Sequence, residues 1–200
     1  MPRRSGKWDN SSVFPIFLIV FGAIGWIASF GLTLERIKVA GDPGAATACD
    51  ISPFISCKSV MLSEQAALFG FPNPLIGLAA FFAPVVIGFA ILAGAKFASW
   101  FWQLFLAGHV LAMVFVIWLF SQSVYDIGAL CLYCMVAWTA TIPLFWSILG
   151  YTGKEGHLGK KLVGFGEVIY EWAWVATILT YATLIGFIII QFWDFWPTLF

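Results

Sequence analysis

Charged side chains are scarce in this sequence. Its 200 residues include 10 Lys and Arg and 10 Asp and Glu, whereas 62% of all residues are hydrophobic. A soluble domain carries about 25% charged residues, so this composition excludes an ordinary water-soluble domain and predicts a chain that lies in lipid. The formal net charge of zero leaves no basic surface of the kind that binds nucleic acid.

Apolar runs take up most of the chain and leave little of it for a separate soluble domain. The first run follows basic residues, as a signal sequence does, but it lacks a convincing cleavage site and is long enough to cross the hydrocarbon core. We therefore predict an all-α integral membrane protein with one domain over residues 1–200. Its five predicted spans are 13–34, 73–93, 97–121, 129–149 and 170–193.

The basic residues predict the orientation of these spans. With the N-terminus in the cytoplasm, every Lys and Arg except Arg36, Lys38 and Lys58 falls on the cytoplasmic side, as the positive-inside rule requires. The same orientation puts the loop 35–72 and the outer end of the fourth span on the extracytoplasmic side. Disulfides persist on that side of a cell membrane.

Cysteine is rare, and all four cysteines fall in two pairs on this outer side. Cys131 and Cys134 form a C-x-x-C at the start of the fourth span, whereas Cys49 and Cys57 lie in the loop 35–72. A thiol at the start of a helix meets unpaired N–H groups and the positive end of the helix dipole, which favour the reactive thiolate. The two pairs could therefore exchange disulfides with each other and with a carrier dissolved in the bilayer.

Two other interpretations of the cysteines stay open at this point. The four could form structural disulfides or be small buried core residues. A zinc site is less favoured, because Cys49 and Cys57 are further apart in sequence than the usual zinc-binding pair, and we predict no metal. Between Cys57 and Gly70, the spacing of Leu62, Ala66 and Phe69 indicates either a short helix at the membrane interface or an ordinary loop.

The sequence of this loop permits a more specific comparison. The segments CDISPFISCKSVMLS at 49–63 and FGFPNPLIG at 69–77 resemble the loop of bacterial vitamin K epoxide reductase homologues. The later C-x-x-C at the head of the fourth span is similar to the redox centre of that family. The resemblance covers the whole chain in the order of its spans.

This resemblance implies a four-helix bundle around a quinone, of menaquinone, ubiquinone or vitamin K type, with a peripheral fifth helix. It also implies that Cys134 lies nearest the quinone, that Cys131 exchanges with Cys57, and that Cys49 meets the thiol of a partner. Many bacterial members carry a fused thioredoxin-like domain after the fifth span. Because this chain stops at Phe200, we expect the partner to be a separate extracytoplasmic thioredoxin-fold thiol oxidase.

Three further residues match positions at which the family contacts the quinone or the redox helix. Asn73 matches an asparagine placed against a quinone carbonyl, although Asn is also a good helix N-cap. Ser63 matches a serine near the contact of the loop with the redox helix, or it belongs to a turn. Trp138 stands where vertebrate members carry a tyrosine, and it could bind the quinone or simply pack in the bundle.

His109 lies near the middle of the third span, where an ionisable group is a functional candidate. We favour a neutral His109 that hydrogen-bonds between helices, with Gln103 on the same span. The predicted function is that of a thiol–quinone oxidoreductase of the bacterial cell membrane. The alternative is a non-catalytic scaffold or transporter with structural disulfides.

Overall fold

The computed structural model describes residues 12–42, 44–50, 52 and 54–193, and these residues form helices joined by short loops, with isolated β-bridges but no β-strand among them. This confirms the predicted all-α class. The long helices are α1 (Val13–Gly41), α3 (Pro74–Leu92), α4 (Ser99–Ser121), α5 (Leu132–Lys154) and α6 (Val163–Gln191). The short elements are α2 (Cys57–Met61), the 3-10 turns η1 (Glu64–Ala67) and η3 (Lys160–Leu162), and the π-helical turn η2 (Gln122–Ile127).

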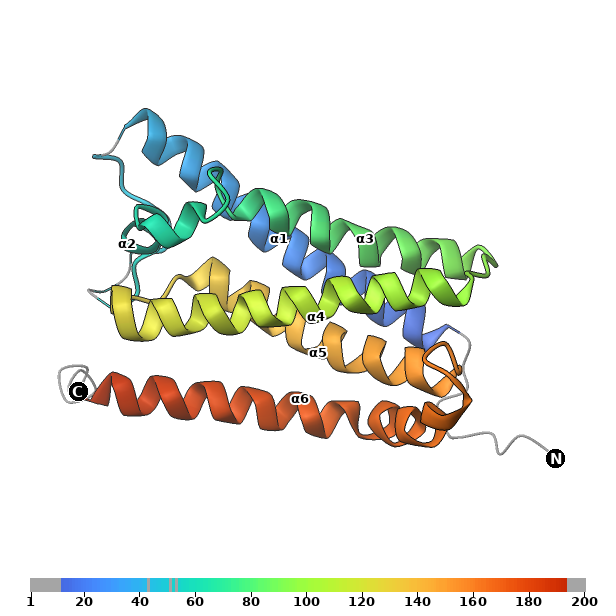
Figure 1. Cartoon of the computed structure of the whole chain (residues 1–200). Helices are drawn as coiled ribbons and strands as arrows, with labels where there is room; N and C mark the ends of the chain where they lie inside the picture. Colours follow the sequence, from blue (N-terminus) through green and yellow to red (C-terminus); the bar gives the residue numbers. More distant parts are fainter. Residues whose placement is uncertain (1–11, 43, 51, 53, 194–200) are drawn as a thin grey trace.

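Five helical segments of the described chain are long and apolar enough to cross a membrane, so the chain is an integral membrane protein. Helix α1 packs on α3 and α5, and α4 packs on α5, whereas α6 packs mainly on α5 (Figure 1). Helix α2 lies at one end of this bundle, and the turns that join α3 to α4 and α5 to α6 lie at the other end. Helix α2, which begins at Cys57, and the start of α5 therefore share one end of the molecule.

Helix α1 extends beyond the predicted span and ends at Gly41 rather than at residue 34. The charged residues after position 34, which include Arg36 and Lys38, suggested that the first span had ended. In the structure their side chains reach loop carbonyls: the Arg36 guanidinium donates to Met61 O, and Lys38 Nζ donates to Ala46 O at 2.6 Å. Val39 on the same segment is buried in one cluster with Cys49 and Cys57, so the end of α1 supports the loop that holds these two cysteines.

The segment 57–70, predicted to be either a short helix or an ordinary loop, contains two short helical elements. Helix α2 ends at Met61, and η1 begins at Glu64. The Ser56 hydroxyl accepts a hydrogen bond from the Ser59 N–H and so caps α2, which is a common way to begin a helix. Leu62 and Phe69 are exposed, so they do not form an apolar face against the bundle.

Helix α6 begins at Val163, before the predicted start of the fifth span at residue 170, and glycines let it approach α5 closely. A Cβ atom added to Gly150 would lie 2.6 Å from the main-chain N and Cα of Tyr170, and one added to Gly153 would lie 2.8 Å from Gly166 Cα. Real side chains do not fit at such distances, so these glycines allow the two helices to touch by their backbones.

We expect Gly150→Ala to destabilise the docking of α6 on α5 by about 1–3 kcal/mol, because the added methyl group overpacks this contact. The measurement is the free energy of unfolding in mixed detergent micelles. The matched control is Gly186→Ala in α6, where no atom lies within 4 Å of the added Cβ. That control should be neutral or stabilising, by up to about 1 kcal/mol, since Ala favours helices. Equal effects of the two changes would contradict the close packing.

Candidate functional site

The loop cysteines form a disulfide that is shielded from solvent. Cys49 and Cys57 are bonded, with their Cα atoms 5.6 Å apart, and their side chains are 1% and 0% exposed. Asp50 braces this disulfide: its carboxylate accepts hydrogen bonds from Ser56 Oγ at 2.8 Å and from the Lys58 N–H at 3.2 Å. Desolvation acts to raise the pKa of Asp50, but these hydrogen bonds and those from Thr47 hold it below its ordinary value.

A β-bridge between Ile55 and Leu130 brings this disulfide to the start of α5. Ile55 pairs with Ser52 and with Leu130, the Ser56 N–H donates to Leu130 O at 3.0 Å, and the Leu130 N–H donates to Phe54 O at 2.8 Å. The residue after Leu130 is Cys131, and the residue after Ser56 is Cys57. The backbone pairing therefore sets the two cysteines side by side.

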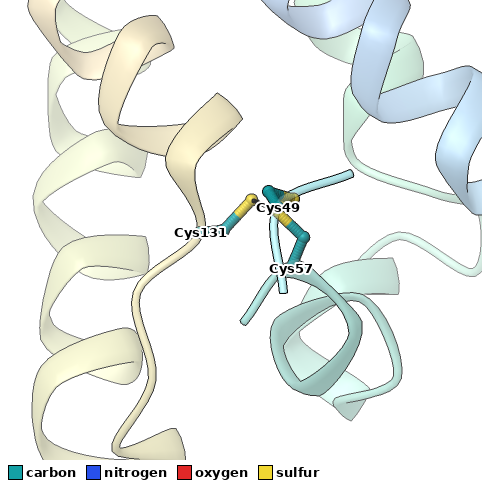
Figure 2. A group of neighbouring side chains, drawn as sticks. All are labelled: Cys49, Cys57 and Cys131. Carbon is teal, nitrogen blue, oxygen red and sulfur yellow. Dashed lines mark hydrogen bonds between the residues drawn. A yellow bond between two sulfur atoms is a disulfide. The ribbon is translucent and has the colours of Figure 1, made fainter. Parts of the chain in front are cut away.

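Cys131 points at the disulfide from the N-cap of α5 (Figure 2). Its thiol is free and buried, and its Sγ lies 3.0 Å from Cys57 Sγ. Reacting atoms in a near-attack arrangement are about 3–3.5 Å apart. A thiolate of Cys131 at this distance is placed to exchange with the Cys49–Cys57 disulfide.

The start of the helix also favours the thiolate of Cys131, which lies just before the membrane-spanning part of α5. A hydrogen bond from the Cys134 thiol holds the pKa of Cys131 below its usual value, although burial of the thiol opposes this. The N–H groups of Cys134 and Tyr133 act in the same direction as the thiol, and the Asp50 carboxylate opposes them. The N–H groups of Cys134 and Tyr133 therefore produce the predicted effect of the helix N-terminus, which is to lower the pKa of this thiol.

The Sγ atoms of Cys49, Cys57 and Cys131 all lie within 4.8 Å of one another, which by distance alone is compatible with a metal ion. Zinc, however, is bound by thiolates. Here two of the three sulfurs are joined to each other, so the cluster has the form of a disulfide with a neighbouring thiol. That form suits thiol–disulfide exchange.

A cavity of about 450 Å³ opens between α1, α3, α4 and α5 below the cysteine cluster. Cys131 and Cys134 lie in its wall, so the C-x-x-C connects the loop disulfide with the interior of the bundle. Most of its other wall residues are apolar. Polar side chains that line it include Ser63, Gln65, Asn73, His109, Gln122 and Ser123. Its size and lining fit a ligand that is mostly apolar and carries a few polar groups.

Asn73 lies in the cavity wall at the N-cap position of α3, but its side chain makes no capping hydrogen bond. Instead Nδ2 donates to Gln65 O at 2.7 Å, and Oδ1 is buried without a hydrogen-bond partner. The amide of Asn73 is therefore bonded to the preceding loop and not to the start of α3.

Ser63 and Trp138 also line the cavity. The Ser63 hydroxyl donates to Val60 O at 2.8 Å, which is consistent with its alternative role in a turn. Trp138 is 5% exposed and meets the ring of Phe120 edge-on, with the ring centroids 5.3 Å apart. The indole is therefore packed in the bundle and is also available to a ligand as part of the wall.

The prediction for His109 is wrong. Its Nδ1 hydrogen-bonds with Phe105 O, at 2.9 Å, within its own helix. Gln103 donates to His157 O, at 2.7 Å, in the loop after α5. Since His109 lines the cavity, it belongs to the wall and not to a bond between helices.

The sequence interpretation missed Gln65, Gln122 and Asp126. Gln65 Nε2 donates to a carboxylate oxygen of Asp126 and, at 3.4 Å, to Gln122 Oε1. Because these partners are 57 and 61 residues away, no local pattern could have linked them to the loop.

Comparison with known proteins agrees with this arrangement. The model of the vitamin K epoxide reductase family matches residues 16–149, more than half of the chain. No curated protein matches the chain. The matched range includes both cysteine pairs, α3, α4, and all but the first residues of α1 and the last residues of α5. The chain is thus a membrane oxidoreductase that belongs to the vitamin K epoxide reductase family.

Proposed function

We propose that the chain carries electrons from an extracytoplasmic dithiol protein, through Cys49 and Cys57 and then Cys131 and Cys134, to a membrane quinone. The observation that carries this proposal is the 3.0 Å separation between Cys57 Sγ, which is in a disulfide, and the free Cys131 Sγ. A scaffold held together by structural disulfides does not need a third, unbonded sulfur at this distance.

The exchange begins with the partner. One thiolate of the partner attacks Cys49, which breaks the Cys49–Cys57 bond and leaves a mixed disulfide and the Cys57 thiolate. The second thiol of the partner then attacks the sulfur of the first, so the partner leaves as a disulfide and the loop pair is a dithiol. Because Cys49 is 1% exposed, binding of the partner has to open the loop around it.

Transfer to α5 follows the same chemistry. The Cys57 thiolate attacks Cys131 in the Cys131–Cys134 disulfide, and Cys134 leaves as a thiolate. Cys49 next attacks Cys57, which closes the loop disulfide and releases Cys131 as a thiolate. The arrangement of the four cysteines described above corresponds to the end of this transfer: the loop pair is bonded and the α5 pair is free.

The cavity residues fit a quinone, although its type stays open. Cys134, Asn73 and Trp138 would hold it, with an apolar wall around its ring. A quinone there would supply the acceptor for two electrons and two protons and would become the quinol. In the chain itself, the corresponding change is closure of the Cys131–Cys134 disulfide.

The partner that fits this chemistry is a separate thioredoxin-fold thiol oxidase. We infer that the redox end of the bundle is extracytoplasmic, with the N-terminus in the cytoplasm of a bacterial cell and residues 1–200 as one membrane domain. Support comes from the lysines at the opposite end, on α5 and η3, which the positive-inside rule assigns to the cytoplasm.

The test uses the purified chain, reduced thioredoxin as a protein dithiol, and duroquinone, whose fully substituted ring does not add thiols. We expect catalytic formation of duroquinol, with one thioredoxin disulfide formed for each duroquinol. The control is the same mixture after alkylation of the free thiols of the reduced chain. If duroquinol forms no faster with the native chain than with the alkylated one, the proposed function is wrong.

A further inference from the structure

The chain just before Cys49 has little packing of its own. Residues 44–48 are Gly, Ala, Ala, Thr and Ala, and only Thr47 among them is buried. Small side chains on an exposed loop bury little apolar surface. After Cys49, the hydrogen bonds of the Asp50 carboxylate hold the chain beside α2. Before Cys49, the position of the chain depends on the disulfide with Cys57 and on contacts of the main chain.

Two lysines bind successive main-chain carbonyls of this segment. Lys38 Nζ donates to Ala46 O at 2.6 Å, which ties the segment to the last turn of α1. Lys58 Nζ, on α2, donates to Ala45 O at 3.4 Å. Since Lys58 directly follows Cys57, its contact joins the same two parts of the chain as the disulfide does.

Contacts that run beside a disulfide also act when the disulfide is open. They limit the freedom of the loop in the dithiol state, so less conformational entropy is lost when the sulfurs are joined again. The two lysines therefore raise the effective concentration of Cys49 at Cys57, and they stabilise the disulfide relative to the dithiol.

This effect favours the arrangement of sulfurs that the structure has, in which the loop pair is bonded and the α5 pair is free. Transfer to α5 ends when Cys49 attacks Cys57 in the Cys57–Cys131 bond. The Cys49–Cys57 bond forms, the Cys57–Cys131 bond breaks, and Cys131 leaves as a thiolate. A Cys49 that stays close completes this step faster than one on a freely moving loop.

We propose that Lys38 and Lys58 are positioning residues for Cys49, which they hold near Cys57 while the loop disulfide is open, so that electrons pass from the loop pair to the α5 pair. The inference rests on the proposed function for the direction of this transfer. The two hydrogen bonds together should raise the equilibrium constant for closing the loop disulfide by about 10-fold. For a two-electron couple, that lowers the reduction potential of the loop pair by about 30 mV.

The experiment measures this potential and not turnover. In a Cys131→Ser, Cys134→Ser background, the full chain is equilibrated with reduced and oxidised glutathione. Closing the loop disulfide converts one oxidised glutathione into two reduced ones, and alkylation measures the fraction of open loop. We expect Lys38→Met with Lys58→Met to lower the equilibrium constant about 10-fold, which raises the potential by about 30 mV. An unchanged or larger constant would overturn the inference.

Two matched pairs of substitutions separate the hydrogen bonds from a general effect of lost charge. Lys38→Arg with Lys58→Arg keeps the charges and the donors, and should keep the constant within about twofold. Lys160→Met with Lys161→Met removes two exposed charges of η3, at the other end of the bundle, and should leave the constant unchanged. A loss of the same size in either pair would show that the contacts with the loop carbonyls are not responsible.

Failure of this inference is distinguishable from failure of the proposed function. Turnover of duroquinone with reduced thioredoxin is measured on the chain with all four cysteines. Normal turnover of that chain, combined with an unchanged constant in the Lys38→Met, Lys58→Met variant, would remove only the role of the two lysines. The electron path through the cysteines would stand.

Discussion

Cys134→Ser is expected to lower quinone reduction by the chain at least about 10³-fold, which is the scale of loss for an essential nucleophile. Cys134 is a free thiol in the cavity wall, as Cys131 is, and we propose that it is the sulfur that meets the carrier. Serine keeps the size of the side chain but cannot form a disulfide with Cys131. Without that disulfide, the chain has no two-electron step with which to reduce the carrier.

The measurement is the initial rate of duroquinol formation with reduced thioredoxin. The matched control is Thr139→Ser on the same helix, at an exposed position, and it should keep the rate within about twofold. Retention of a substantial rate in Cys134→Ser would contradict the assigned role of Cys134.

A second measurement on the same variant follows disulfide exchange between Cys131 and the loop cysteines. Cys131 in Cys134→Ser lies next to the loop disulfide but has no resolving partner on α5. Its thiolate can attack Cys57, so that a Cys57–Cys131 bond forms and Cys49 is released. We expect alkylation to label Cys49 in this variant. We also expect peptide mapping to detect the new Cys57–Cys131 bond. Labelling of Cys131 alone would show that the loop and helix sulfurs do not exchange.

Local sequence patterns predicted some of the site well. The C-x-x-C preceded a long apolar run, and the structure indeed has Cys131 at the N-cap of α5. The meeting of Cys57 and Cys131 is different, because 74 residues separate them and no periodicity connects them. That prediction came from the family resemblance, and its physical cause is the backbone pairing of Ile55 and Ser56 with Leu130.

Hydropathy was least informative where charged side chains end in hydrogen bonds. Arg36 and Lys38 suggested that the first span had ended, yet α1 continues to Gly41, and the long side chains of both residues donate to main-chain carbonyls of the segment that follows. The hydrogen bonds of Gln65 were hidden for another reason. A glutamine in a short helix has no distinctive spacing, and its partners are set by the tertiary fold alone.

Cys57→Ser is expected to stop electron transfer from a protein dithiol, again by at least about 10³-fold, because Cys49 alone cannot form the loop disulfide. The same change should leave Cys49 able to form a stable bond with the partner. Cys57 is the sulfur that would otherwise displace the partner from Cys49, since the two are bonded in the structure.

Trapping this bond distinguishes the roles of the two loop cysteines. The reagent is a thioredoxin with a single active-site cysteine, activated as its mixed disulfide with thionitrobenzoate. The Cys49 thiolate of Cys57→Ser attacks the thioredoxin sulfur, forms the protein–protein disulfide and releases coloured thionitrobenzoate. Cys49→Ser is the matched control, because it keeps Cys57, which is 0% exposed and lies against Cys131.

We expect Cys57→Ser to release thionitrobenzoate at least about 10-fold faster than Cys49→Ser, because exposure of the thiol controls its access to a protein disulfide. Cys49 is also buried, so the difference depends on which cysteine the opening of the loop exposes first. A faster reaction of Cys49→Ser would reverse the proposed order in which the two loop cysteines act. The partner would then meet Cys57 directly, and Cys49 would serve only to resolve the bond between Cys57 and Cys131.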